Sequence, residues 1–161
     1  MIILVCGLPG VGKSSFCSTL DREHHYAHYD MERPQTWPRA DLHRLWEANR
    51  AAFLNAVASA HAGKVALDWG FPPSCLPLVA ELKAAGVAIC WFYADESLAK
   101  RSFLTRSPGD GAKFEHQMQL IKNAGLPNGL GAIEVEVLGA NGFRDQNEIW
   151  EIIFDRARKT E

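Results

Sequence analysis

Residues 7 to 14 read Gly-Leu-Pro-Gly-Val-Gly-Lys-Ser and match the spacing G-x-x-x-x-G-K-[ST]. Glycines in this pattern let successive backbone N–H groups turn inward around an anion, in conformations that a side chain would forbid. Lys13 adds an ammonium group for the β- and γ-phosphates of a nucleoside triphosphate, and the Ser14 hydroxyl can ligate Mg²⁺. The segment lies between an expected strand and an expected helix, which disfavours a plain glycine-rich turn. The expected phosphate-binding residues are Gly7, Leu8, Pro9, Gly10, Val11, Gly12, Lys13, Ser14 and Ser15.

Two carboxylates follow apolar runs that resemble buried strands. Asp68 ends the run 65–67, and Asp30 closes a shorter strand before it. Ligands of open parallel sheets gather at the carboxyl ends of the strands, so both side chains should face the phosphate loop. We expect Asp68 to bind Mg²⁺ together with Ser14, and Asp30 to accept the proton of an attacking hydroxyl. Arg33, in the arrangement Asp-x-x-Arg, suits an anion binder, so Asp30, Arg33 and Asp68 are the expected substrate-binding residues. The alternative for each aspartate is a structural role in the following turn.

Two arginines precede a flexible segment at residues 107–111. Arg101 and Arg106 are placed where a mobile lid could carry cations over a transferring phosphate. On a helix with 3.6 residues per turn, two side chains five residues apart point about 140° away from each other. Both arginines can therefore reach one phosphate only if the helix ends between them. The alternative is that one or both are solvated. The expected catalytic residues are Lys13, Asp30, Arg101 and Arg106.

The elements that must position these residues alternate between short apolar runs and segments of helical periodicity, which predicts an α/β fold with a parallel sheet. The expected strands cover residues 2–6, a segment ending at 29–30, 65–68, 87–93 and 133–138. The expected helices cover residues 13–20, one long helix over 42–61, then 74–85, a helix capped by Asp95 and ending near 106, 113–123 and 145–157.

The composition of the 161 residues, with 47% hydrophobic and 22% charged, predicts a single domain over residues 1–161. The net charge of -2 gives no general attraction to nucleic acid or to an anionic membrane. Four cysteines without a CxxC pair favour buried thiols in a reducing compartment, and no apolar run reaches the ~18 residues of a membrane span. We therefore expect a cytoplasmic protein whose partners are ATP and a small molecule. Its oligomeric state is left open.

Four motifs follow one another along the chain: Gly-Leu-Pro-Gly-Val-Gly-Lys-Ser, Asp30-Met31-Glu32-Arg33, Leu67-Asp68-Trp69-Gly70-Phe71 and Trp91-Phe92-Tyr93-Ala94-Asp95, the last leading to Arg101 and Arg106. Together they resemble the small P-loop ATP-binding kinases related to zeta toxins and chloramphenicol phosphotransferase. The resemblance covers roughly residues 1 to 110, and Asp-Trp-Gly-Phe at 68–71 is its most discriminating part. It implies a five-stranded sheet of order 2-3-1-4-5, ATP and Mg²⁺ as cofactors, Asp30 as base and lid arginines. The loop containing Asn141 is a candidate adenine contact by topology only.

Other interpretations carry less weight. His24, His25 and His28 lack companions at a recognised metal-binding spacing, and Trp37 and Trp46 are expected to anchor the core or a loop rather than stack on an acceptor. A GTP-dependent switch would need an Asn-Lys-x-Asp motif, which the sequence lacks. The expected function is transfer of the ATP γ-phosphate to a hydroxyl of a small acceptor. A non-catalytic nucleotide-binding module or an ATP hydrolase is the alternative.

Overall fold

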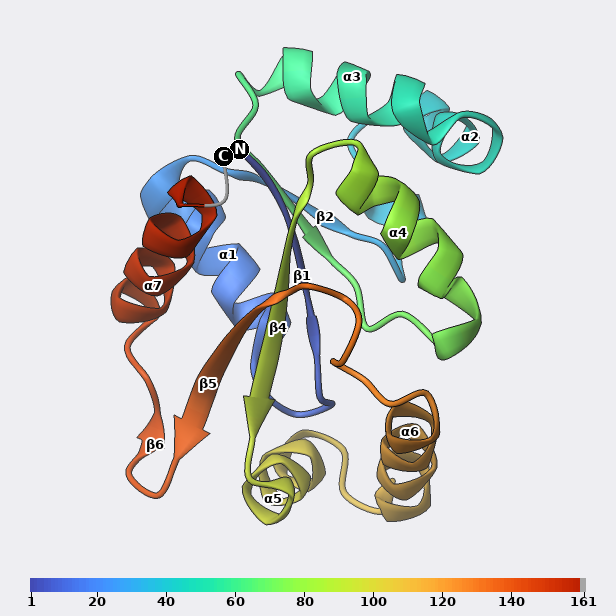
Figure 1. The fold of residues 1–161 in the computed structure, drawn as a ribbon. Helices are drawn as coiled ribbons and strands as arrows, with labels where there is room; N and C mark the ends of the chain where they lie inside the picture. Colours follow the sequence, from blue (N-terminus) through green and yellow to red (C-terminus); the bar gives the residue numbers. More distant parts are fainter. Residues whose placement is uncertain (160–161) are drawn as a thin grey trace.

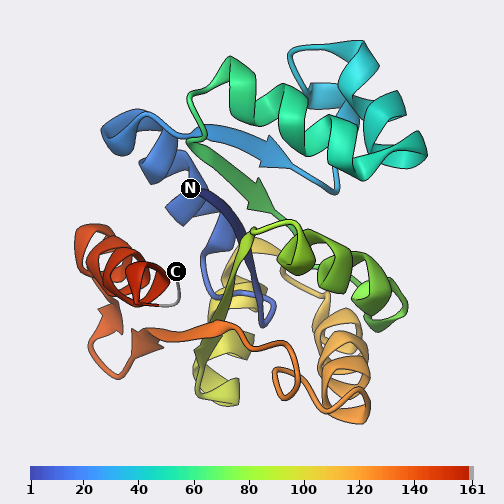
Figure 2. The ribbon, with the colours of Figure 1, turned by 45° about the horizontal axis from the view of Figure 1, so that its top comes forward.

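The computed structural model describes residues 1–159 and contains one six-stranded sheet in the order β2-β3-β1-β4-β5-β6. Helices α1 and α7 lie on one face of the sheet and α4 on the other, while α5 and α6 lie beyond the end at which β4 finishes (Figures 1 and 2). The first five strands are parallel and have the expected order, 2-3-1-4-5. The predicted α/β class is therefore confirmed.

The elements follow the predicted alternation closely. The strands are β1 (Ile2–Gly7), β2 (Ala27–Asp30), β3 (Val65–Asp68), β4 (Ala88–Ala94), β5 (Ile133–Gly139) and β6 (Gly142–Phe143). The helices are α1 (Lys13–His24), α2 (Ala40–Ala48), α3 (Arg50–Ala60), α4 (Leu76–Ala84), α5 (Glu96–Arg106), α6 (Gly111–Asn123) and α7 (Gln146–Arg158). Short 3₁₀ turns occur at Pro34–Thr36 and Pro73–Cys75.

The central strand β1 is covered on both faces, which is why its sequence is continuously apolar rather than alternating. Residues 3 to 6 are all fully buried, and β1 pairs in parallel with β3 on one side and β4 on the other. In this register Val5 lies opposite Asp68 and Gly7 opposite Phe92. The phosphate loop and Asp68 are therefore brought to the same end of the sheet by backbone pairing alone.

The sixth strand was not predicted. It is two residues long and pairs antiparallel with the end of β5, through Leu138 with Phe143 and Gly139 with Gly142. A strand this short has too few residues to show the two-residue alternation of hydrophobicity on which strand prediction depends. Gly142 has φ 104°, a conformation that favours glycine at this turn.

The predicted single helix over residues 42–61 is wrong. The chain forms α2 and α3, separated by Asn49 in an extended conformation (φ -157°, ψ 90°). The Asn49 side chain accepts a hydrogen bond from the backbone N–H of Ala52 (3.0 Å) and so caps α3. Helical periodicity continues across the break, which is why the apolar pattern alone gave one helix.

The tryptophans of the 34–38 loop and of α2 anchor the structure, as expected. Trp37 is buried, stacks on Phe53 and donates its indole N–H to the backbone oxygen of Asp30 (2.8 Å). Trp46 packs edge-on against Phe53 and Trp69. The Trp37 hydrogen bond ties the backbone of Asp30 to this aromatic core.

All four cysteines are free, and three of them are buried: Cys6, Cys17 and Cys90. Burial raises the pKa of the Cys6 thiol to about 12, despite the opposing effect of the Lys13 ammonium. Within residues 1–159 no helix has both the length and the apolar character needed to cross a bilayer.

Candidate active site

The phosphate loop connects β1 to α1 in conformations that require glycine at two close approaches. Gly7 has φ 133°, and a Cβ there would lie 2.0 Å from the backbone oxygen of Phe92. Gly10 has φ 84°, and a Cβ there would lie 2.4 Å from the backbone oxygen of Ala99 on α5. The loop is therefore held tightly between β4 and α5, and the Ser102 hydroxyl adds a hydrogen bond to the Gly10 oxygen (2.7 Å).

The backbone N–H groups of residues 10 to 15 take part in none of the hydrogen bonds formed by residues 1–159. Gly10 and Ser14 line the cavity beside the loop, and the start of α1 follows directly. Unpaired amides at a helix N-terminus, with the helix dipole behind them, favour an anion at this point. The arrangement can hold the β- and γ-phosphates of a nucleotide.

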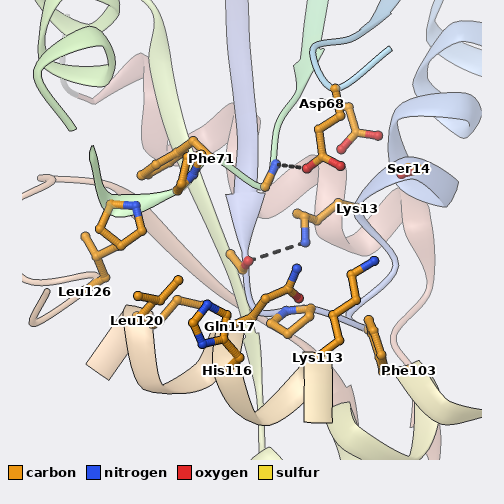
Figure 3. A pocket seen from close by; sticks show the side chains of 18 of the residues that line it. Lys13, Ser14, Asp68, Phe71, Phe103, Lys113, His116, Gln117, Leu120 and Leu126 are labelled. Atoms are coloured by element: carbon orange, nitrogen blue, oxygen red, sulfur yellow. Dashed lines mark hydrogen bonds between the residues drawn. The ribbon is translucent and has the colours of Figure 1, made fainter. Parts of the chain in front are cut away.

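Lys13 is folded back onto this loop. Its Nζ donates hydrogen bonds to the backbone oxygens of Leu8 (2.8 Å) and Gly7 (3.4 Å), and Figure 3 shows it between α6 and Asp68. Desolvation lowers the pKa of the Lys13 ammonium below its usual value, and the Asp68 carboxylate is the largest influence that opposes this shift. A phosphate beside Nζ would favour the charged form in the same way as Asp68.

The two predicted carboxylates meet at the carboxyl ends of neighbouring strands. Asp30 on β2 is the register partner of Asp68 on β3, and both line the cavity. Asp68 is 5% exposed, and His28 Nε2 lies 3.5 Å from its Oδ2. Asp30 is more open: its Oδ1 accepts the Glu32 N–H (2.9 Å), and its Oδ2 lies 3.8 Å from Arg33 Nε.

A cavity of about 790 Å³ extends from the phosphate loop to α6. Figure 3 shows Lys13, Ser14 and Asp68 on one side of it and the side chains of α6 on the other. The predicted residues that line it are Gly7, Pro9, Gly10, Lys13, Ser14, Asp30, Arg33, Asp68 and Arg106. The tertiary structure therefore places the loop lysine, both carboxylates and one lid arginine around a single space.

A second cavity, of about 500 Å³, adjoins the loop on its other side. Arg101 lines only this second cavity, whereas Arg106 lines both. Helix α5 includes both arginines and ends at Arg106. The helix therefore does not end between them, as it would have to for both side chains to reach one phosphate. The structure thus gives Arg106 access to the space beside Lys13 and separates Arg101 from it. The chain around Asn141 borders this second cavity through Gly139, Ala140, Gly142 and Phe143.

Comparison with solved structures identifies the architecture. A gluconokinase from Sinorhizobium meliloti 1021 matches with a TM-score of 0.59 and 18% identity, over 99% of this chain and 92% of the other. A shikimate kinase from Acinetobacter baumannii, in complex with shikimate, matches with a TM-score of 0.60 and 14% identity, over 96% and 93%. The shikimate kinase of Aquifex aeolicus matches with a TM-score of 0.53 and 17% identity, over 99% and 98%.

The chain has the fold of the small P-loop kinases. No protein-family model matches the sequence, and no curated protein matches it significantly. At these identities the similarity establishes the fold, so the chemistry must be argued from the residues of this chain.

One pair of oxygen ligands and one mixed cluster could hold a metal ion. Ser14 and Asp68 both line the main cavity and offer the oxygen ligands that Mg²⁺ prefers. Cys17, His28 and Asp68 also place one ligand atom each within 4.8 Å of one another. Burial raises the pKa of the Cys17 thiol well above its usual value, which disfavours the thiolate that a metal would need. The arrangement therefore fits Mg²⁺ at Ser14 and Asp68 better than a soft metal at the cysteine.

The sequence reasoning missed one whole wall of the cavity. Lys113, His116, Gln117 and Leu120 line it from α6, and Trp91 lines it from β4. The α6 residues recur at helical spacing on a helix that was predicted. That spacing was a usable signal, but nothing in it showed that this face would turn toward the phosphate loop.

Proposed function

We propose that the protein is an ATP-dependent phosphotransferase that moves the γ-phosphate to a hydroxyl group of a small acceptor. The observation that carries the proposal is the single cavity shared by the unpaired loop amides, Lys13, and the partner carboxylates Asp30 and Asp68. A phosphate cradle alone would suit any nucleotide binder. A second, more open carboxylate facing the same space supplies what phosphoryl transfer to a hydroxyl further requires.

In this proposal the residues divide the chemistry. The loop amides and Lys13 bind the triphosphate, and Ser14 and Asp68 would hold Mg²⁺, which neutralises charge on the phosphates. Asp30 accepts the proton of the acceptor hydroxyl while the oxygen of that hydroxyl forms a bond to the γ-phosphorus. The bond from that phosphorus to the bridging oxygen breaks, and ADP leaves. Arg106 faces the same space and stabilises negative charge on the group in transit.

The nucleoside is assigned to the second cavity. This cavity is lined by Gly12 and Ser15 of the loop and by Phe143, whose ring lies close to Gly12. Phe143 is 50% exposed and offers an aromatic face to a base. Arg101 lines this cavity but not the main one, and we therefore assign it to nucleotide binding. The main cavity is left for the γ-phosphate and the acceptor, with Arg33 at its rim as an anion contact.

The fold of gluconokinase and shikimate kinase supports a small acceptor, because both named enzymes are kinases of small molecules. The motif resemblance to the kinases related to zeta toxins and chloramphenicol phosphotransferase agrees with the same reaction class. Both similarities support the reaction class and leave the identity of the acceptor open.

Calorimetry with MgATP tests the nucleotide site directly. We expect the wild type to bind and Lys13→Ala to bind at least about tenfold more weakly, because a charged hydrogen-bond donor is lost. Lys122→Ala is the matched control, since Lys122 is paired with Glu96 (2.7 Å) outside both cavities. Absence of MgATP binding by the folded wild type would overturn the proposal.

Turnover then separates the three functions. ADP release that depends on an added alcohol indicates a kinase, and the same rate with water alone indicates an ATP hydrolase. Binding without turnover across an acceptor library indicates a non-catalytic module. The kinase proposal requires the first result, with the phosphate recovered on the alcohol.

A further inference from the structure

Helix α6 has two faces whose roles the fold explains. Phe114 and Met118 are buried in the core and attach the helix to the domain. On the outward side, Lys122 pairs with Glu96 of α5. The core contacts of Phe114 and Met118 therefore determine which face of the helix remains for the cavity.

The third face is a continuous stripe along the cavity. Its members recur at i, i+3, i+4, i+7 and i+8, and they are Lys113, His116, Gln117, Leu120 and Ile121. The side chains of Lys113, His116 and Gln117 form no hydrogen bond or ion pair with any residue in the range 1–159. Leu120 is 37% exposed, and its side chain lines the cavity. The fold therefore makes no use of the polar side chains of this stripe, whereas Ile121 packs partly against the core.

The stripe changes chemistry along its length. Lys113 lies at the end near Phe103 and the phosphate loop, and His116 and Gln117 follow (Figure 3). Leu120, about 10 Å further along the helix axis, lies with Leu126 and Phe71 at the opposite end (Figure 3). The α6 wall of the cavity therefore changes from a charged end, through hydrogen-bonding side chains, to an apolar end.

The apolar end is tied to the carboxylate end. Glu32 Oε1 accepts a hydrogen bond from the backbone N–H of Gly70 (3.2 Å), and this contact holds the loop that carries Phe71 against the segment following Asp30. Asp30 and Phe71 thus line the same cavity from two segments that this hydrogen bond joins. Phe71 lies on the side of the cavity away from Ser14, where the body of an acceptor would extend (Figure 3).

We infer that the acceptor is an amphipathic alcohol rather than a uniformly hydroxylated sugar or polyol. Its reacting hydroxyl faces Asp30, its other polar groups bind His116 and Gln117, and a hydrocarbon ring or branched chain occupies the space among Phe71, Leu120 and Leu126. This assignment rests on the proposed function for the reacting hydroxyl. A polyol would place hydroxyl groups against Phe71 and Leu120 without hydrogen-bond partners, which disfavours its binding.

Two probes that share a 1,2-diol head and differ only in the tail test this inference. 1-Phenylethane-1,2-diol carries an apolar ring, and erythritol carries two further hydroxyl groups. With MgATP replaced by a non-hydrolysable analogue, we expect calorimetry to show at least about tenfold tighter binding of the phenyl diol. Equal affinity, tighter binding of erythritol, or no binding of the phenyl diol would overturn the inference.

Substitutions assign the preference to the stripe. Leu120→Ser should remove most of the preference for the phenyl diol, whereas Phe154→Ser should keep it, because Phe154 is similarly exposed (39%) but lines neither cavity. Gln117→Ala should weaken binding of both diols, with Gln119→Ala on the outward face as its control. Melting temperatures identify any variant that fails to fold. A preference that survives Leu120→Ser in a folded protein would contradict the assignment.

The two proposals fail in different ways. If MgATP binds and phosphate is transferred to erythritol but not to the phenyl diol, the acceptor chemistry is wrong and the kinase function stands. If the phenyl diol binds with the expected preference while MgATP does not bind, the cavity chemistry stands and the kinase function is wrong.

Discussion

Asp30 and Asp68 are register partners on adjacent parallel strands, yet their surroundings differ sharply. Asp68 is 5% exposed and has His28 Nε2 3.5 Å from its carboxylate, whereas the Asp30 side chain is 29% exposed. Backbone pairing thus brings two carboxylates to one edge, and they differ in burial. The sheltered group suits a metal ligand, and the open one can reach a substrate.

Replacing Asp30 should abolish transfer and leave nucleotide binding nearly intact. Asp30→Asn keeps the size of the side chain and removes the proton acceptor, so we expect kcat to fall at least about 100-fold. The dissociation constant for MgATP, measured by calorimetry, should stay within about threefold of the wild type. Asp41→Asn is the control, because Asp41 pairs with Arg39 outside both cavities. Full turnover by Asp30→Asn would remove Asp30 from the base role.

Substitution of Gly10 should weaken MgATP binding and should lower the unfolding free energy by more than backbone strain alone would. Gly10→Ala adds a Cβ 2.4 Å from the Ala99 oxygen at φ 84°, whereas Gly86→Ala adds one at φ 86° with nothing within 4 Å. Both should lose about 1–2 kcal/mol of unfolding free energy through the left-handed conformation. We expect only Gly10→Ala to lose additional stability and to bind MgATP at least about tenfold more weakly, because α5 must move. Equal effects of the two substitutions would show that the contact with α5 is unimportant.

The two arginines of α5 should have separable kinetic effects. Arg106 lines the space beside Lys13, so Arg106→Ala should lower kcat by about 100-fold or more. Arg101 lines only the second cavity, so Arg101→Ala should act mainly by raising the KM for ATP. Steady-state kinetics of both variants on the same acceptor measure this difference. A larger loss of kcat in Arg101→Ala would reverse the assignment.

The buried Cys6 thiol should make the protein less stable in alkali. Its pKa is raised by burial from 9.0 to about 12, so the unfolded chain releases this proton at lower pH than the folded one. Its contribution is therefore fully present below pH 9.0 and is lost as the pH rises toward 12, by about 1.4 kcal/mol per pH unit.

Urea denaturation between pH 8 and 11 tests this dependence. The decline in unfolding free energy should be shallower in Cys6→Ala than in the wild type, while Cys75→Ala, at a half-buried position, should follow the wild type. Identical slopes in all three proteins would show that the thiol does not titrate as its burial requires.

The sequence by itself determined the phosphate loop, the parallel sheet and the strand-end aspartates. These are local signals: a fixed spacing of glycines and a lysine, continuous apolar runs, and an aspartate at the end of each run. The order 2-3-1-4-5 came from the resemblance to the P-loop kinases, and the structure confirms it.

Only the tertiary structure decided the rest of the site. Asn49 divides one apolar helical pattern into two helices, because a side-chain cap can end a helix without interrupting its periodicity. Arg101 and Arg106 were equivalent in sequence, but the direction of α5 separates them between two cavities. The stripe on α6 reads as an ordinary solvated face until the fold turns it toward Lys13. Which face of a helix meets a cavity depends on packing between segments far apart in the chain, and local sequence carries no record of that packing.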